Sequence, residues 1–158
     1  MKWISLGLVC LIVLIAGFGY YNTTIVNPRV LATIQNEPEG ERAGIVMVLQ
    51  FENGKTIPVN YLREGNLVFV GADGPWWREF PTTREAGQGA PVRLTIRGKT
   101  YQGFAKTELD DQAYVDEVFA RLRPKAPDWL PDWLNGKLVV IEVLDAPWSD
   151  GTQLDVIQ

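Results

Sequence analysis

From residue 44 onward, short runs of apolar residues are separated by residues that favour turns. The clearest turn is Asn53-Gly54, a strong signal for a β-hairpin, which follows an apolar and β-branched run over 45–51. Because an open sheet of this length would leave exposed edges, the pattern favours a closed antiparallel barrel. The predicted strands cover 45–51, 55–63, 67–72, 92–97, 100–106 and 137–144.

Two helices are predicted beside these strands. Asn27-Pro28 is typical of a helix start, with Asn as the cap and Pro in the first turn, and this helix would run to about Gln35. The second helix covers about 110–123 and ends before Pro124. Its predicted buried stripe consists of Val115, Val118, Phe119 and Leu122.

Residues 71–80 form a turn-rich loop that carries two adjacent tryptophans followed by Arg78. Glycine lets backbone approach a flat ligand closely, and indole rings offer area for stacking. Arginine supplies a planar cationic fork suited to phosphate or carboxylate. The loop therefore suggests a site for an aromatic anion such as a flavin. Alternatively, both indoles anchor the core or an interface, and Arg78 is a solvated neighbour.

Pro58 interrupts the second predicted strand. Since proline cannot donate a hydrogen bond to a sheet, it predicts an edge or bulged strand, or a strand beside a ligand site.

The amino-terminal run over residues 3–21 is uncharged and nearly long enough to cross a bilayer as a helix. It predicts a transmembrane anchor and a single-pass membrane protein, and the alternative is a cleavable signal peptide. The expected organisation is an anchor over 1–21, a short helix and acidic linker over 22–43, the barrel over 44–144 and a C-terminal tail over 145–158.

Composition excludes several classes of chemistry. The chain has no histidine, and its only cysteine, Cys10, lies in the amino-terminal apolar run. These facts exclude a histidine-dependent nucleophile and a histidine-ligated metal, and no metal site is predicted. The net charge of −4 and the absence of a basic run argue against nucleic-acid binding. If the protein is an enzyme, a bound cofactor is expected to carry the chemistry.

A tandem Pro-Asp-Trp-Leu sequence occupies residues 127–134. Three roles are open for it: a clamp on a ligand, a contact with the membrane surface, or a plug at one end of the barrel.

The ordered series of motifs resembles the deazaflavin-dependent nitroreductase family, within the wider group of flavin-binding split barrels. The resemblance rests on 57–62, Glu64-Gly65-Asn66, 68–72, Trp76-Trp77-Arg78 and 90–98, and it covers about residues 44–106. It implies a six-stranded antiparallel split β-barrel, mainly β, with one or two flanking helices after the anchor. It also implies a deazaflavin coenzyme or FMN, hydride transfer to a small electrophile, and a homodimer.

The resemblance also implies a cofactor site. Lys55 and Thr56 would lie at the phosphate, and the strand with Pro58, Asn60 and Tyr61 would run along the ring. The remaining cofactor-binding residues would be Gly71, Ala72, Trp77 and Arg78. No catalytic residue is identified.

Two functions follow as hypotheses. The first is a deazaflavin- or flavin-dependent oxidoreductase of the nitroreductase or quinone reductase type, for which a quinone is an attractive small-molecule substrate. The second is a non-catalytic, membrane-anchored split-barrel binding module that has lost its cofactor. Glu79, which stands where the family usually has asparagine, favours the second hypothesis.

Overall fold

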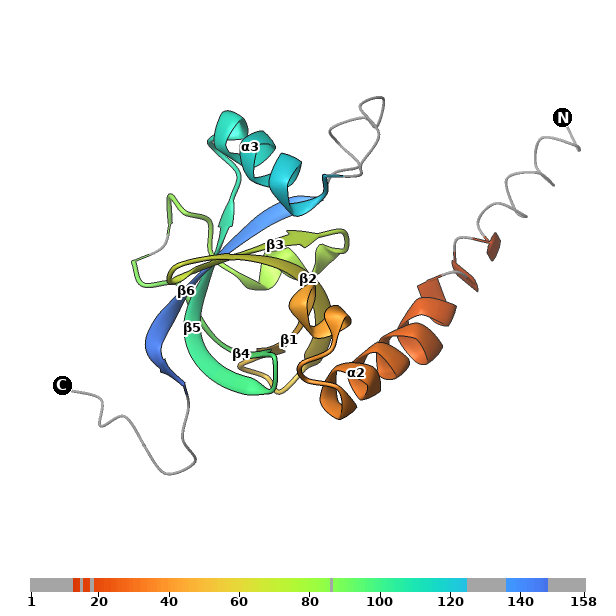
Figure 1. Cartoon of the computed structure of the whole chain (residues 1–158). Coiled ribbons are helices and arrows are strands. Elements are labelled where there is room, and N and C mark those ends of the chain that lie inside the picture. Colours follow the sequence, from red (N-terminus) through yellow and green to blue (C-terminus); the bar gives the residue numbers. More distant parts are fainter. Residues whose placement is uncertain (1–12, 15, 18, 86, 125–135, 148–158) are drawn as a thin grey trace, which may run out of the picture.

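A computed structural model describes residues 13–14, 16–17, 19–85, 87–124 and 136–147 of the chain (Figure 1). The strands are β1 (Val46–Phe51), β2 (Thr56–Glu64), β3 (Leu67–Ala72), β4 (Ala90–Ile96), β5 (Lys99–Glu108) and β6 (Lys137–Pro147). The helical elements are η1 (Asn22–Val26), α2 (Asn27–Asn36), η2 (Glu41–Gly44), η3 (Pro75–Glu79) and α3 (Gln112–Leu122). The tandem sequence at 127–134 lies outside the described residues.

The strands close into a barrel in the order β1-β2-β3-β6-β5-β4, and neighbouring strands are antiparallel. This confirms the predicted mainly β, six-stranded antiparallel barrel. The predicted hairpin turn is also present. Gly54 has a φ of +84°, which glycine adopts without strain, and the Asn53 Oδ1 accepts a hydrogen bond from the Lys55 amide at 3.0 Å.

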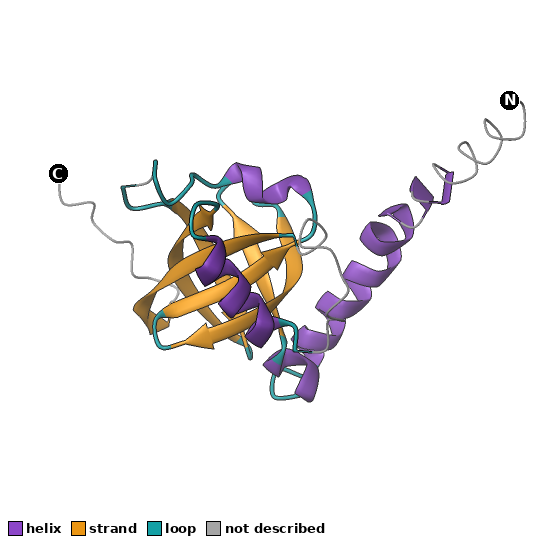
Figure 2. Ribbon diagram, turned by 90° about the horizontal axis from the view of Figure 1, so that it is seen from above, coloured by secondary structure: helices purple, strands orange, loops and turns teal. Residues whose placement is uncertain are grey.

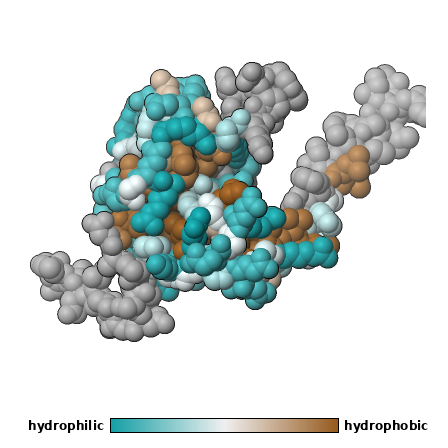
Figure 3. Space-filling model, in the orientation of Figure 1, coloured by the Kyte–Doolittle hydropathy of each residue, from teal (hydrophilic) through white to brown (hydrophobic). Residues whose placement is uncertain are grey.

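Successive side chains along each strand point alternately into the barrel interior and to its outer face. The interior contains Met47 and Leu49 from β1, Val68 and Val70 from β3, and Ile141 from β6, among other apolar residues. Burying these side chains supplies the main stabilisation of the barrel. On the outside, polar residues surround apolar ones on the face seen in Figure 3, and further apolar surface lies along α2.

Helix α3 lies across the outer face of the barrel, whereas α2 runs away from the barrel and meets it near its C-terminal end (Figure 2). α3 places Val115, Val118 and Phe119 against Phe69 and Leu138 of the barrel wall, as its apolar stripe predicted. Its first turn is capped by Asp111, whose Oδ1 accepts a hydrogen bond from the Tyr114 amide at 3.0 Å.

α2 begins at the predicted residue but lacks the predicted cap. The π-helical turn η1 leads directly into it, so Asn27 is its first helical residue and caps nothing. Ile34 of α2 is buried against Ala43 and Val46 in a cluster separate from the barrel interior.

The predicted membrane anchor requires correction. Residues 1–12, 15 and 18 of that segment lie outside the described residues, and its other residues, 13–14, 16–17 and 19–21, are exposed. Within the described part of the chain, no helix has the length and apolar character needed to cross a membrane. This finding contradicts the predicted transmembrane helix and the single-pass membrane localisation.

β2 has two halves with different neighbours. From Thr56 to Asn60 it pairs with β1, whereas it pairs with β3 only from Tyr61 to Glu64. Pro58 lies in the first half, opposite Val48, where its missing N–H costs no bond to β3. β2 lies between β1 and β3 in the closed barrel, so the predicted alternative of an edge strand is wrong. Because its first half has no register partner in β3, the barrel wall opens beside Pro58.

Candidate ligand cleft

A cleft of about 550 Å³ lies where β2 and β3 separate. It is bounded by the first half of β2, the end of β3, the β3–η3 connection, and residues from α2 and the end of α3. The lining residues are Asn27, Lys55, Ile57, Pro58, Val59, Asn60, Gly71, Asp73, Gly74, Pro75, Trp76, Glu79 and Arg123. The volume lies within the range of small-molecule sites.

η3 sets the indole of Trp76 at the wall of this cleft. The Trp76 ring meets Phe51 edge-on at a centroid distance of 6.0 Å and Phe80 at 6.1 Å. Phe51 and Phe80 stack on each other at 5.3 Å. Since Phe51 and Phe80 belong to the buried barrel core, this cluster fixes the orientation of Trp76 through packing.

The ionisable residues that line the cleft form two opposite-charge pairs. The Lys55 Nζ lies 2.7 Å from the Glu79 Oε1, and the Arg123 Nη2 lies 2.7 Å from the Asp73 Oδ1. The Asn53 side-chain amide also donates to Glu79, at 3.4 Å. With two cations and two carboxylates, the cleft carries no net charge.

Four of the predicted cofactor-binding residues line the cleft together: Lys55, Pro58, Asn60 and Gly71. Gly71 has a structural role there, because a Cβ at its position would lie 2.8 Å from the Arg123 Nη2 and 2.9 Å from the Phe119 Cε1. Its lack of a side chain lets α3 approach the barrel, and this approach brings Arg123 to the cleft.

The other five predicted residues are not among those that line the cleft. The Thr56 hydroxyl donates to the Gly54 carbonyl at 3.3 Å, and the Tyr61 hydroxyl donates to the Ala43 carbonyl at 3.3 Å. Ala72 is buried in the barrel interior. The remaining two residues pack together: Trp77 lies partly buried against the core, and the Arg78 guanidinium lies over its ring at 5.2 Å.

Sequence reasoning missed five polar or aromatic residues of the cleft: Asn27, Asp73, Trp76, Glu79 and Arg123. Trp76 and Glu79 lie in the turn-rich loop over 71–80, whose two tryptophans and Arg78 already indicate a ligand site. Arg123 comes from the far end of α3, about which the loop gives no local information.

The cleft does not fit the phosphate of a flavin or deazaflavin cofactor. A phosphate monoester carries about −1.5 to −2 charges at neutral pH and needs uncompensated donors. Here a carboxylate lies within 2.7 Å of each cation that lines the cleft. The ring of such a cofactor fits better, since Trp76, Pro58 and Pro75 provide flat apolar surface.

Comparisons with known proteins leave the family open. No protein-family model matches the chain, and no curated protein matches it. One solved structure that is similar is from Listeria innocua and has the provisional description pyridoxamine 5'-phosphate oxidase. The similarity covers 77% of this chain and 93% of that one, with 16% sequence identity and a TM-score of 0.44. At this level the likeness carries no argument about the site, and the deazaflavin-dependent nitroreductase family is not confirmed.

Proposed function

We propose that the protein is a non-catalytic binding module whose cleft accepts a flat, largely apolar ring without a phosphate group. The observation that carries this proposal is the charge pairing of the cleft, with Lys55 beside Glu79 and Arg123 beside Asp73. A ligand with a phosphate would have to approach two carboxylates, whereas a neutral ring would not.

The ring would stack against Trp76, whose orientation is fixed by Phe51 and Phe80. Stacking of aromatic groups contributes roughly 0.5–1.5 kcal/mol beyond the burial of area. The side-chain amides of Asn27 and Asn60 line the same cleft and can pair with polar atoms at the ring edge.

Riboflavin and FMN test this proposal because they differ only by the phosphate. Both are titrated into the full chain, and tryptophan fluorescence reports binding. Riboflavin is expected to bind at least as tightly as FMN. The Trp76→Ala substitution should lower the affinity for riboflavin about two- to tenfold, because the stacking contact is lost. Tighter binding of FMN, or no binding of riboflavin at millimolar concentration, would contradict the proposal.

Glu79→Gln sharpens the same experiment. The substitution removes the carboxylate beside Lys55 but keeps a side chain of similar size. FMN affinity should rise roughly three- to tenfold, because a repulsive charge next to the phosphate is gone, while riboflavin affinity should not change. Glu85→Gln, outside the cleft, is the matched control and should affect neither ligand.

The second candidate is an oxidoreductase that uses deazaflavin or FMN and passes hydride to a small electrophile such as a quinone. The convergence of Lys55, Pro58, Asn60 and Gly71 at one cleft favours it. In this case Lys55 would turn from Glu79 to the cofactor phosphate, which an exposed ion pair permits at a cost of about 0–1 kcal/mol.

If the protein is this oxidoreductase, the wild type is expected to bind FMN or deazaflavin with micromolar affinity. The Lys55→Glu variant is expected to lose that binding. The homodimer that the family resemblance implies stays a prediction, which light scattering on the full chain tests.

A further inference from the structure

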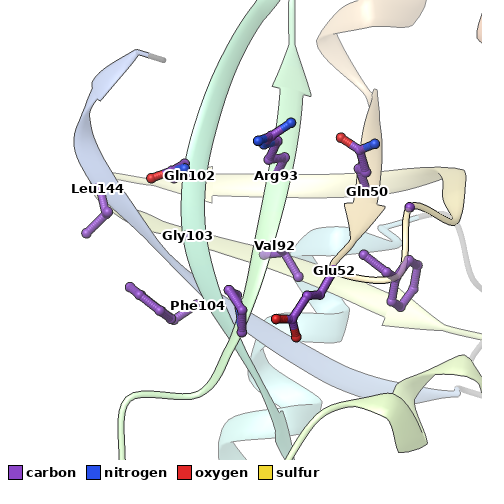
Figure 4. Close-up of a pocket in the computed structure, with 11 residues that line it drawn as sticks. Gln50, Glu52, Val92, Arg93, Gln102, Gly103, Phe104 and Leu144 are labelled. Atoms are coloured by element: carbon purple, nitrogen blue, oxygen red, sulfur yellow. The ribbon is translucent and has the colours of Figure 1, made fainter. Parts of the chain in front are cut away.

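The ligand cleft and a smaller hollow on the barrel differ in how their walls are built. The smaller hollow, of about 340 Å³, lies on the outer face of β1, β4 and β5 (Figure 4). The residues that line it come from these strands, from the turn after β1 and from β6, all of them parts of the closed barrel. In the cleft, Asn27 at the start of α2 forms part of the wall, and α2 lies outside the sheet. This part of the wall can therefore move without breaking hydrogen bonds between strands.

The contact between α2 and the barrel lies near the C-terminal end of the helix. Ile34 is buried there with Ala43 and Val46, and Val30, one turn earlier, packs on the same cluster but is only half-buried. Figure 2 shows that the rest of α2 runs away from the barrel. Because the free energy of docking grows with the apolar area buried, this small cluster holds α2 far less firmly than the shared core holds the strands.

The linker after α2 provides a fixed pivot. Pro38 lies against the turn between β4 and β5, where a Cβ on Gly98 would be 2.9 Å from the Pro38 Cβ. Ala43 is fully buried, and its carbonyl accepts a hydrogen bond from the Tyr61 hydroxyl at 3.3 Å. Between this anchored linker and the helix lies Glu37, whose backbone angles are not helical. The helix can thus rotate about the residues around Glu37 while the linker stays on the barrel.

The face of α2 that docks on the barrel continues toward the cleft. Four residues have the spacing of one helix face and are at least half-buried: Asn27, Val30, Leu31 and Ile34. Asn27, at the far end of this face, lines the cleft. It lies about 10 Å from Ile34 along the helix axis, so a rotation of about 15° at the pivot moves it by roughly 3 Å. A small rotation of α2 therefore changes the width of the cleft.

We propose that α2 is a hinged lid that closes on a flat apolar ring bound against Trp76. The inference rests on the proposed function, because the ring supplies the surface onto which the lid closes. Val30 and Leu31 gain apolar contact with the bound ring, and the Asn27 amide reaches polar atoms at its edge. Since the ring makes these contacts in the closed state alone, its binding shifts α2 toward closure. The ligand then leaves after the lid has opened.

Hydrogen exchange reports closure of the lid. The full chain is compared with and without saturating riboflavin, and exchange is followed by mass spectrometry. The amides of α2 are expected to exchange at least fivefold more slowly with riboflavin bound. The exposed turn at Gly65-Asn66, which lies outside the cleft, is the internal control and should show no change.

Stopped-flow fluorescence of riboflavin release tests whether docking of α2 controls dissociation. Ile34→Val and Ile34→Ala remove one methyl group and then most of the side chain from the docking cluster. They should speed release about threefold and at least tenfold, because the lid opens more often. Gln35→Ala, on the exposed face of the same helix, is the matched control and should leave the release rate unchanged.

The outcomes separate the lid from the proposed function. If riboflavin binds but exchange in α2 does not slow, or if Ile34→Ala releases riboflavin at the wild-type rate, the lid is overturned and the proposed function stands. If riboflavin does not bind at millimolar concentration, both are overturned. Should Ile34→Ala also loosen the strands, the release rate of the milder Ile34→Val decides.

Discussion

At the scale of single residues, Thr107 connects the cleft wall to the barrel. It is a fully buried polar residue, and its hydroxyl donates to the Trp77 carbonyl at 3.0 Å. Its backbone amide donates to the Pro81 carbonyl at 2.9 Å, and its carbonyl accepts from the Thr83 amide at 3.0 Å. These bonds hold η3 and the loop after it against β5, and η3 carries the Trp76 ring.

Replacing Thr107 with valine should therefore loosen the cleft wall as well as the fold. Valine has the same shape but removes the hydroxyl's hydrogen bond to the Trp77 carbonyl, which keeps the Phe80 amide as a donor at 3.1 Å. The loss of one such hydrogen bond costs about 0.5–1.5 kcal/mol. Urea denaturation measures this loss, and riboflavin titration measures the effect on the cleft. Thr100→Val, which removes a half-buried hydroxyl contact with Thr95 at 3.3 Å, is the control. Equal losses in both variants would show that Thr107 has no special role.

At the scale of elements, the junction between β5 and α3 is held by backbone donors. The Glu108 carboxylate accepts hydrogen bonds from the Asp110 amide at 2.8 Å and the Asp111 amide at 3.1 Å. Burial alone would raise the pKa of Glu108, but hydrogen bonds from the Asp111 and Asp110 amides, the Thr83 side chain and the Leu109 amide outweigh it and lower the pKa below 4.5. The charged form of Glu108 thus stabilises the turn that leads into the Asp111 cap.

Because the pKa of Glu108 is lowered in the folded protein, the stability that this residue contributes should decrease as the pH falls. In the unfolded chain Glu108 titrates near its ordinary value, so its contribution is fully present above that pH and is lost as the pH falls through the lower folded value. The free energy of unfolding of the wild type should exceed that of Glu108→Gln by about 1 kcal/mol between pH 5 and 7. The difference should shrink below about pH 4.5.

Urea denaturation at pH 7, 5, 4 and 3 tests this expectation. Glu39→Gln, an exposed residue of the linker, serves as the control and should change stability by at most about 0.5 kcal/mol. A difference between wild type and Glu108→Gln that grows on acidification would contradict the assigned role.

At the scale of the whole molecule, the barrel could be predicted because its determinants are local. Alternation fixes which face of each strand is buried, and Asn53-Gly54 fixes the first hairpin. One wall of the cleft shares this property, since Pro58 and Asn60 lie along β2 and Lys55 directly precedes it.

The rest of the cleft depends on how distant elements pack. Asp73 and Arg123 are 50 residues apart and meet only because α3 docks over Gly71. The sequence also could not distinguish Trp76 from Trp77 as the cleft residue. That choice depends on the rotation of η3, which is set by packing on Phe51 and Phe80.

The separation of the apolar clusters predicts two units of different stability. Ile141 is fully buried in the barrel interior, whereas Ile34 of α2 is buried in the small cluster with Ala43 and Val46. Ile141→Ala should lower the global stability by about 2–5 kcal/mol and speed hydrogen exchange in the most protected amides of the strands, because the barrel has one shared core. Ile34→Ala should instead speed exchange mainly within α2, because that helix can detach without opening the barrel. Hydrogen exchange of the full chain, followed by mass spectrometry, compares the two variants. If Ile34→Ala also speeds exchange across the strands as much as Ile141→Ala does, then α2 and the barrel unfold as one cooperative unit.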